Sequence, residues 1–298
     1  MATMQVLKSA QDESVNFVFS GDHPGVFESR YVRRSPEYPA VYLSSQSGCV
    51  QACRFCHLTT TGQTKFVNAR IDDYLAQAGH VLDWYDKQLK DGKCAKARCV
   101  HYNFMARGEP LDNPYLLQDG KNLFEILGEG AMKRDLFPRF LISSIFPKSF
   151  AGQSLSKTFP VINPEIYYSI YSVREQFRKR WMPRAMPVNE ALTILREYQE
   201  DTKKIIKLHW AFIEGENDSA EDVEALCKTV RESGVRADFA IVRYNPYSEK
   251  YGREPNEEVV MRRAKEIGEM MPFSKVKVIT RVGFDVKASC GMFVTAQQ

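Results

Sequence analysis

The stretch SSQSGCVQACRFC, residues 44–56, places three of the seven cysteines of the chain within eight residues. Cys49, Cys53 and Cys56 have the spacing C-x3-C-x2-C, and a strand-like run, AVYLSS at 40–45, comes directly before them. In a reducing compartment, cysteines grouped in this way bind metal or take part in catalysis more often than they form disulfides. In parallel α/β folds, functional sites gather at the carboxyl ends of strands. The stretch therefore predicts both a site and its place in a fold.

Two kinds of metal site are compatible with three thiols in one loop. A structural zinc ion takes four protein ligands, and joint ligation by Cys56 and the adjoining His57 would be awkward. A four-iron cluster held by three thiolates instead leaves its fourth iron open to a small molecule. The spacing favours a four-iron cluster, with a purely structural iron or zinc knuckle as the alternative.

Composition narrows the class of protein. Of the 298 residues 44% are hydrophobic, and 41 Lys and Arg against 37 Asp and Glu give a formal net charge of +4. No run reaches the roughly 18 to 20 apolar residues that span a bilayer, and the N-terminus has no apolar core typical of a signal peptide. We therefore expect a cytoplasmic protein with no membrane partner. Its mildly basic balance permits a nucleic-acid partner without demanding one.

Strand and helix patterns alternate along the rest of the chain. Apolar spacing predicts a helix over 188–198 and another over 223–230, where Ser219 and Asp222 form a capping box and Cys227 lies on the buried stripe. Strands are expected at 40–45, 99–106, 139–146, 166–171, 205–213, 237–244 and 275–280.

This alternation predicts parallel strands joined by right-handed crossovers. The expected fold class is α/β, a partial barrel of the (β/α)6 type with parallel strands. We expect residues 1–27 to form an N-terminal extension and residues 28–298 to form one core domain that includes the loop around Cys290.

The cysteine loop, with Phe55 just before its last cysteine, resembles that of the radical S-adenosylmethionine superfamily. Gly108, Glu109 and Pro110 at the end of the next strand resemble the segment of that superfamily that holds the ammonium of the methionine part. The resemblance implies a [4Fe-4S] cluster bound by Cys49, Cys53 and Cys56. It further implies that the open iron binds S-adenosylmethionine, whose reductive cleavage gives a 5′-deoxyadenosyl radical.

A narrower resemblance runs from about residue 26 to 293. The segments SSQSGCVQACRFC, GEPLDNP, the Ser169 region before FRKRWMP, EGEND, YNPY and DVKASCGMF together resemble the RlmN/Cfr-type methyltransferases of adenosine carbons in ribosomal and transfer RNA. The resemblance implies that Cys290 accepts a methyl group from one S-adenosylmethionine. A radical from a second then takes hydrogen from the methylated sulfur, and the methylene radical adds to an adenine carbon.

The same resemblance implies roles for further residues and partners. Glu28 corresponds to a proton acceptor, and Ser143, Ser169 and Asn245 correspond to positions that contact S-adenosylmethionine, on which Phe55 also packs. RNA, either ribosomal or transfer RNA, is the implied substrate, and a flavodoxin-type protein is the expected electron donor. Without the resemblance, Cys290 would be interpreted as a buried thiol near a strand end.

The chain departs from the family pattern at two places. Tyr42 occupies the position of a second catalytic cysteine, seven residues before Cys49, and a phenol cannot form the disulfide that releases the product. Cys94 or Cys99, an external thiol, or a different end to the reaction would be needed. In addition, only about 27 residues precede Glu28, too few for the helical accessory domain of the family. RNA recognition would then depend on the barrel and its basic rims.

Two basic clusters are either solvated faces or RNA contacts. One contains Arg30, Arg33 and Arg34, and the other contains Arg178, Lys179, Arg180 and Arg184. Tyr31 and Trp181 beside them are candidates for base stacking or for ordinary packing.

Methylation of an adenine carbon of RNA through a methylated Cys290 is the favoured function. The alternatives are a radical enzyme with a non-RNA substrate or a non-methylating outcome, and a nucleic-acid-binding protein whose cluster is only structural. The last predicts no cleavage of S-adenosylmethionine.

Overall fold

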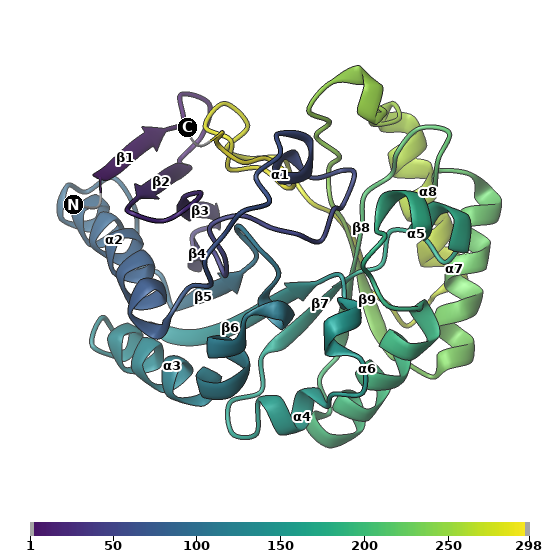
Figure 1. Cartoon of the computed structure of the whole chain (residues 1–298), viewed down its shortest axis with the longest axis horizontal. Helices are drawn as coiled ribbons and strands as arrows, with labels where there is room; N and C mark the ends of the chain where they lie inside the picture. The colour runs from purple at the N-terminus through teal and green to yellow at the C-terminus, as the bar shows by residue number, and fades with distance from the viewer. Residues whose placement is uncertain (1–2, 296–298) are drawn as a thin grey trace.

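A computed structural model describes residues 3–295, which form one curved sheet with ten strands in the order β1 to β10 (Figure 1). The first four strands pair antiparallel, and every pair from β4 to β10 is parallel. The strands are β1 (Thr3–Lys8), β2 (Val15–Ser20), β3 (Phe27–Ser35), β4 (Tyr38–Tyr42), β5 (Cys99–Phe104), β6 (Phe137–Ser144), β7 (Glu165–Ser169), β8 (Ile206–Trp210), β9 (Ala237–Ile241) and β10 (Val276–Val278). Because β1 and β10 end the order of pairing, the sheet is an open, partial barrel.

The helices are α1 (His57–Thr60), α2 (Ile71–Lys90), α3 (Pro114–Met132), α4 (Leu155–Thr158), α5 (Glu175–Trp181), α6 (Val188–Thr202), α7 (Ala220–Ser233) and α8 (Glu257–Met270), with 3-10 turns η1 (Pro110–Asp112), η2 (Lys148–Phe150) and η3 (Glu249–Tyr251). The longer helices α2, α3, α6, α7 and α8 cover the outer, convex side of the sheet, whereas α1 lies on its inner side (Figure 1). The predicted α/β class and parallel partial barrel are confirmed. In the described part of the chain, no helix has both the length and the apolar character needed to cross a bilayer.

Side chains alternate between the two faces of each strand, and this alternation separates the core from the site. In β5, Val100, Tyr102 and Phe104 are fully buried beneath the helices. The alternate residues His101 and Asn103 face the inside of the curve and line a cavity there. The apolar residues that face the helices therefore fix the register of each strand, and the polar residues that alternate with them line the cavity.

The helix signals in the sequence are confirmed where they were strongest. The Ser219 hydroxyl accepts a hydrogen bond from the Asp222 amide at 3.1 Å, and the Asp222 carboxylate accepts one from the Ser219 amide at 3.3 Å. The two bonds form the expected capping box of α7. Cys227 is completely buried in the main core, as its place on the apolar stripe predicted.

The N-terminal strands were not predicted. Residues assigned to an extension form β1 and β2, which continue the sheet beyond β3. Along β3, Glu28 and Arg30 are buried and paired with each other, so their charges are not those of a solvated strand. Polar and apolar residues are interspersed in FESRYVRRS, the sequence of β3, but the polar residues Glu28 and Arg30 point into the protein.

Candidate active site

A cavity of about 540 Å³ lies inside the curve of the sheet. It brings together side chains from loops and strands that are far apart in the sequence. Of the residues that the sequence singled out, Cys49, Cys53, Phe55, Cys56, Gly108, Glu109, Ser143, Ser169 and Cys290 line this cavity. Glu28 and Asn245 lie behind its wall.

The cysteine loop leaves the end of β4 and crosses the interior before α1. Cys53 is buried and Cys49 and Cys56 are partly buried, and none of the three forms a disulfide. Burial raises the pKa of all three thiols, that of Cys56 to about 11. A buried thiol forms a thiolate when a nearby cationic centre compensates for the lost solvation, and bound metal does this.

Within residues 3–295, no three His, Cys, Asp or Glu side chains are arranged to hold a single metal ion. A four-iron cluster makes a different demand, because each thiolate binds a different iron. Three unpaired cysteines that line one cavity fit that demand.

Glu109 is held by a turn that requires glycine before it. Gly108 has φ of +86°, and a Cβ there would lie 2.6 Å from the Cβ of Gln46. The Glu109 carboxylate accepts hydrogen bonds from the amides of Leu111 at 3.0 Å and Ile145 at 3.2 Å. Burial nevertheless raises its pKa to about 7. No described cation pairs with Glu109, so a ligand ammonium suits this place.

Phe55 and the interior serines form the wall beside the cysteines. The Phe55 ring stacks on that of Tyr171 with centroids 4.4 Å apart. The hydroxyl of Ser143 lies 3.4 Å from that of Ser169 and 3.2 Å from Nδ1 of His209. The structure thus brings Ser143 and Ser169 together on neighbouring strands, with Phe55 nearby on the same cavity.

Cys290 lies on a segment that returns from β10 to the N-terminal strands (Figure 1). Its side chain is exposed to the cavity. Burial by the surrounding protein raises the pKa of the thiol, while a hydrogen bond with Tyr171 and the charges of Arg30 and Arg34 lower it. The thiol therefore faces the same space as the three clustered cysteines.

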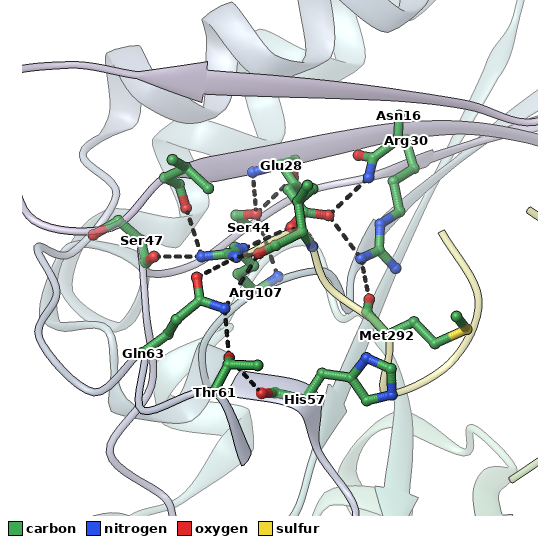
Figure 2. Close-up of polar contacts among 12 residues, drawn as sticks. Asn16, Glu28, Arg30, Ser44, Ser47, His57, Thr61, Gln63, Arg107 and Met292 are labelled. Carbon is green, nitrogen blue, oxygen red and sulfur yellow. Dashed lines mark hydrogen bonds and ion pairs between the residues drawn. The ribbon is translucent and has the colours of Figure 1, made fainter. Parts of the chain in front are cut away.

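A buried ionic network holds this segment in place (Figure 2). Glu28 is fully buried and pairs with Arg107 at 2.8 Å and Arg30 at 2.9 Å. It also accepts a hydrogen bond from the Val294 amide at 2.9 Å. Arg30 donates to the Met292 carbonyl at 2.7 Å, and Arg107 donates to the carbonyl of Val294.

Glu28 does not itself line the cavity, although its ion-pair partner Arg30 does. The Glu28 carboxylate also accepts a hydrogen bond from the Asn16 side chain at 2.9 Å. Burial raises the pKa of Glu28, but the charges of Arg107 and Arg30 outweigh it and hold the pKa below its usual value. The network keeps the carboxylate ionised and occupied on both oxygens.

Asn245 and His57 also contact the Cys290 segment. The Asn245 amide group donates to the Cys290 carbonyl at 2.9 Å, while its Oδ1 is buried without a partner. His57 donates its backbone N–H to the Gly291 carbonyl at 3.0 Å. Its ring Nε2 lies 3.1 Å from the Asn245 carbonyl.

Tyr42 lines the cavity, but the two cysteines considered as substitutes for a thiol at this position do not. Cys94 packs against the main core, and Cys99 begins β5, at the end of the strand opposite to Glu109. Neither lines the cavity with Cys290. This removes both as internal substitutes for a cysteine at position 42 in the arrangement described.

Ordinary packing accounts for the aromatic candidates. Tyr31 and Trp181 are each 1% exposed, so of the two alternatives ordinary packing describes both side chains. The basic clusters are solvated only in part. Lys179, Arg180 and Arg184 are exposed, whereas Arg178 is buried and donates to the carbonyls of Ile170 and Met186. Arg30 belongs to the network around Glu28.

Sequence reasoning missed several residues of the site. Arg107 stands directly before Gly108 in the sequence, and His209 and Lys277 lie within the strands expected at 205–213 and 275–280. In each strand the signal was present as a polar residue at every second position, which marks the inward face. That pattern does not predict which side chains from other strands these residues face across the cavity.

Known proteins resemble the chain over nearly its whole length. A ribosomal RNA large subunit methyltransferase Cfr from Lachnoclostridium phytofermentans is 28% identical over 263 residues, which cover 85% of this chain and 69% of the relative. A dual-specificity RNA methyltransferase RlmN from Aliarcobacter butzleri is 22% identical over 305 residues, with coverage of 97% and 79%. No protein-family model matches the chain.

Solved structures share the fold. A radical SAM methyltransferase from Sphaerobacter thermophilus matches with a TM-score of 0.80 and 20% identity, covering 98% of this chain and 80% of that one. HydG, a maturase of the [FeFe]-hydrogenase, matches with a TM-score of 0.58, 12% identity and coverage of 82% and 52%.

The chain thus shares the open parallel barrel of radical SAM proteins of known structure and has a cavity lined by three clustered cysteines. Its similarity to the Cfr and RlmN sequences, together with this fold, makes it a radical SAM, RlmN/Cfr-like protein.

Proposed function

We propose that this protein is a radical S-adenosylmethionine enzyme that methylates an adenine carbon of RNA through a methylated Cys290. One observation carries the proposal. The Cys290 thiol lines the same cavity as Cys49, Cys53, Cys56 and Glu109, although it lies more than 180 residues further along the chain. The names of the Cfr and RlmN relatives support RNA as the substrate.

The donor set fits a [4Fe-4S] cluster and S-adenosylmethionine. When bound, these groups would supply a methyl group and a carbon radical able to take hydrogen from an unactivated C–H bond. Cys49, Cys53 and Cys56 would hold the cluster. Glu109 would bind the ammonium of the methionine part, and Gly108 allows the turn that aims it.

The other residues position and shield the reacting groups. Phe55, Ser143 and Ser169 would contact S-adenosylmethionine from the cavity wall. Asn245 was expected to contact it as well, but it lies behind that wall and would act by holding the Cys290 carbonyl. Cys290 would carry the methyl group to the base. The walls exclude bulk water, which protects a reactive intermediate from side reactions.

Charge supports a polyanionic substrate. Among the described residues that line the cavity are seven Lys and Arg and two carboxylates, Glu109 and Asp238. Such an excess of positive charge attracts nucleic acid.

The proposal also covers the domain boundaries, the electron donor and the cellular location. The core domain is residues 28–298, the electron donor is a flavodoxin-type protein, and the location is the cytoplasm, where a reducing environment preserves cluster thiols. Glu28 was expected to accept a proton from the substrate. Its contacts favour a positioning role, because they tie it to the backbone around Val294 and Met292.

Mass spectrometry of the reconstituted, anaerobic enzyme tests the function. After incubation with S-adenosylmethionine, wild type should carry one methyl group on Cys290, and with reductant and total RNA it should yield methylated adenosine. Cys290→Ala should lose both products and still form 5′-deoxyadenosine. Cys99→Ala, outside the cavity, is the matched control and should behave as wild type.

Two outcomes would redirect the proposal. Formation of 5′-deoxyadenosine with no methyl on Cys290 would keep the radical enzyme and reject this mechanism. No cleavage of S-adenosylmethionine at all would leave the alternative of a binding protein with a structural cluster.

A further inference from the structure

Arg34 and Tyr42 form a polar pair at the open side of the barrel. Nη1 of Arg34 on β3 donates a hydrogen bond to the Tyr42 hydroxyl on β4 at 3.0 Å. Nε of Arg34 reaches the Thr280 carbonyl, beyond the end of β10, at 3.5 Å. Both side chains line the cavity. The pair therefore spans the gap between the first and last strands that enclose the site.

The charge of Arg34 is not neutralised. Four other cavity cations have carboxylate partners: Arg30 pairs with Glu28, Lys207 with Asp238, and both Arg243 and Arg281 with Glu254. Among the described residues, no carboxylate lies within ion-pair distance of Arg34, and the same holds for Lys277. A cation with no counter-charge in a protein cavity is suited to an anionic ligand.

The neighbours of Arg34 add no negative charge. The row Ser169, His209, Ala240 and Lys277 runs side by side across β7 to β10. Burial, assisted by the positive charge of Arg34, lowers the pKa of His209 to about 4, so this imidazole is neutral at pH 7. The charge of Arg34 lowers the pKa of both His209 and Cys290, so Arg34 lies within electrostatic range of both side chains.

We propose that Arg34 and Tyr42, with Lys277 on the same cavity, bind a phosphate group of the substrate nucleotide. The inference rests on the proposed function and names which part of an RNA this site would recognise. Because the Tyr42 oxygen accepts from Arg34, its own O–H is free to donate to the ligand, as are the remaining guanidinium N–H groups. The Tyr42 hydroxyl, the Arg34 guanidinium and the Lys277 ammonium group would thus donate to the oxygens of one phosphate.

This assignment gives position 42 a function that a thiol could not perform. A cysteine is a weak hydrogen-bond donor, whereas a phenol held by a guanidinium presents a fixed O–H. Arg34 also lies within electrostatic range of Cys290. A nucleotide held here by its phosphate would therefore have its base on the side of the reactive thiol.

Calorimetric binding of AMP and of adenosine to the reconstituted enzyme tests the site. Charge-assisted hydrogen bonds contribute about 1.5 to 3 kcal/mol, so wild type should bind AMP roughly tenfold to a hundredfold more tightly than adenosine. Arg34→Gln should bring the two affinities to within about threefold. Arg34→Lys should keep part of the preference, and Tyr42→Phe should lower it severalfold.

Arg33→Gln is the matched control, because it removes the same charge one residue away. Arg33 donates to the carbonyls of Pro36 and Ala95 and does not line the cavity. This variant should keep the wild-type preference for AMP. Equal loss in both glutamine variants would show a general effect of charge and overturn the site.

Other results overturn the inference or the proposed function separately. Equal affinity of wild type for AMP and adenosine, or no measurable binding of AMP, overturns the phosphate site even if RNA is methylated. A preference for AMP that depends on Arg34, in a protein that never methylates RNA, keeps the site and rejects the proposed function.

Discussion

Among single residues, Glu109 shows how burial sets the chemistry of a side chain. Its carboxylate has two backbone donors and no cation, and burial raises its pKa to about 7. In the unfolded chain the group titrates near pH 4.5. The contribution of Glu109 to the free energy of unfolding is therefore fully present below pH 4.5 and is lost as the pH rises through about 7. Above that pH the unliganded site holds a buried carboxylate without a counter-charge, which a ligand cation would supply.

Affinity for S-adenosylhomocysteine should consequently depend on pH. The ligand ammonium favours ionised Glu109, so affinity should rise roughly tenfold between pH 6 and pH 7.5, as expected for a group with a pKa of about 7. Glu109→Gln should bind more weakly and without this pH dependence, as measured by calorimetry on the reconstituted enzyme. The same slope in the variant would assign the titration to another group.

The sequence identified individual site residues where a motif was local. Cys49, Cys53, Cys56, Gly108 and Glu109 lie in two short motifs, and the structure places all five on one cavity. The surroundings of Glu28 were not predictable, because Arg107 and Val294 are 79 and 266 residues away. Motif matching names a residue, whereas its protonation state depends on neighbours that only the fold supplies.

At the scale of elements, β3 and the Cys290 segment depend on each other. Glu28 and Arg30 on β3 bind backbone groups of Met292 and Val294. Asn16 on β2 donates to the Val286 carbonyl at 3.1 Å. The N-terminal strands therefore act as the anchor of the segment that carries the thiol.

Glu28→Gln should loosen that segment. Removing the carboxylate leaves the guanidiniums of Arg30 and Arg107 buried without their counter-charge, which typically costs about 3 to 5 kcal/mol of stability. Denaturant unfolding should show this loss, and hydrogen exchange should quicken over residues 286–294.

The surface pair of Glu37 and Arg98 provides the control. Glu37→Gln should change stability by less than about 1 kcal/mol. Unchanged exchange over residues 286–294 in Glu28→Gln would contradict the anchoring role.

Strand prediction succeeded or failed according to which face carries the apolar residues. The runs in β5 to β9 are apolar on the face covered by helices and were recognised from sequence. In β3 the polar face is also buried, because its charges pair inside the protein. Composition alone cannot distinguish an ion pair in the interior from charges in water.

At the scale of the whole molecule, the cavity is more strongly positive than the net charge of the chain suggests. The chain has a net charge of only +4, yet seven cationic and two acidic side chains line one cavity. The alternation of strands and helices predicted the curved sheet. It could not predict this concentration of charge, which arises when inward positions from eight strands meet.

The RNA-dependent step should therefore be sensitive to salt. If about three phosphates are neutralised, the KM for single-stranded RNA should rise roughly twentyfold between 50 and 200 mM KCl, because bound counterions are released from the nucleic acid. Methyl loading of Cys290, which needs no RNA, should change less than twofold. Steady-state assays and mass spectrometry measure the two steps, and equal salt dependence would argue against RNA contacts in the cavity.

The anchoring of the Cys290 segment also bears on the order of folding. Its contacts join residues separated by 266 to 276 positions, as in Asp285 with Ser9 and Val294 with Glu28. Contacts of such long sequence separation pay their loop-closure entropy late, after the intervening strands have assembled. We therefore expect the segment to dock last, which would leave Cys49, Cys53 and Cys56 accessible to an incoming cluster until it does.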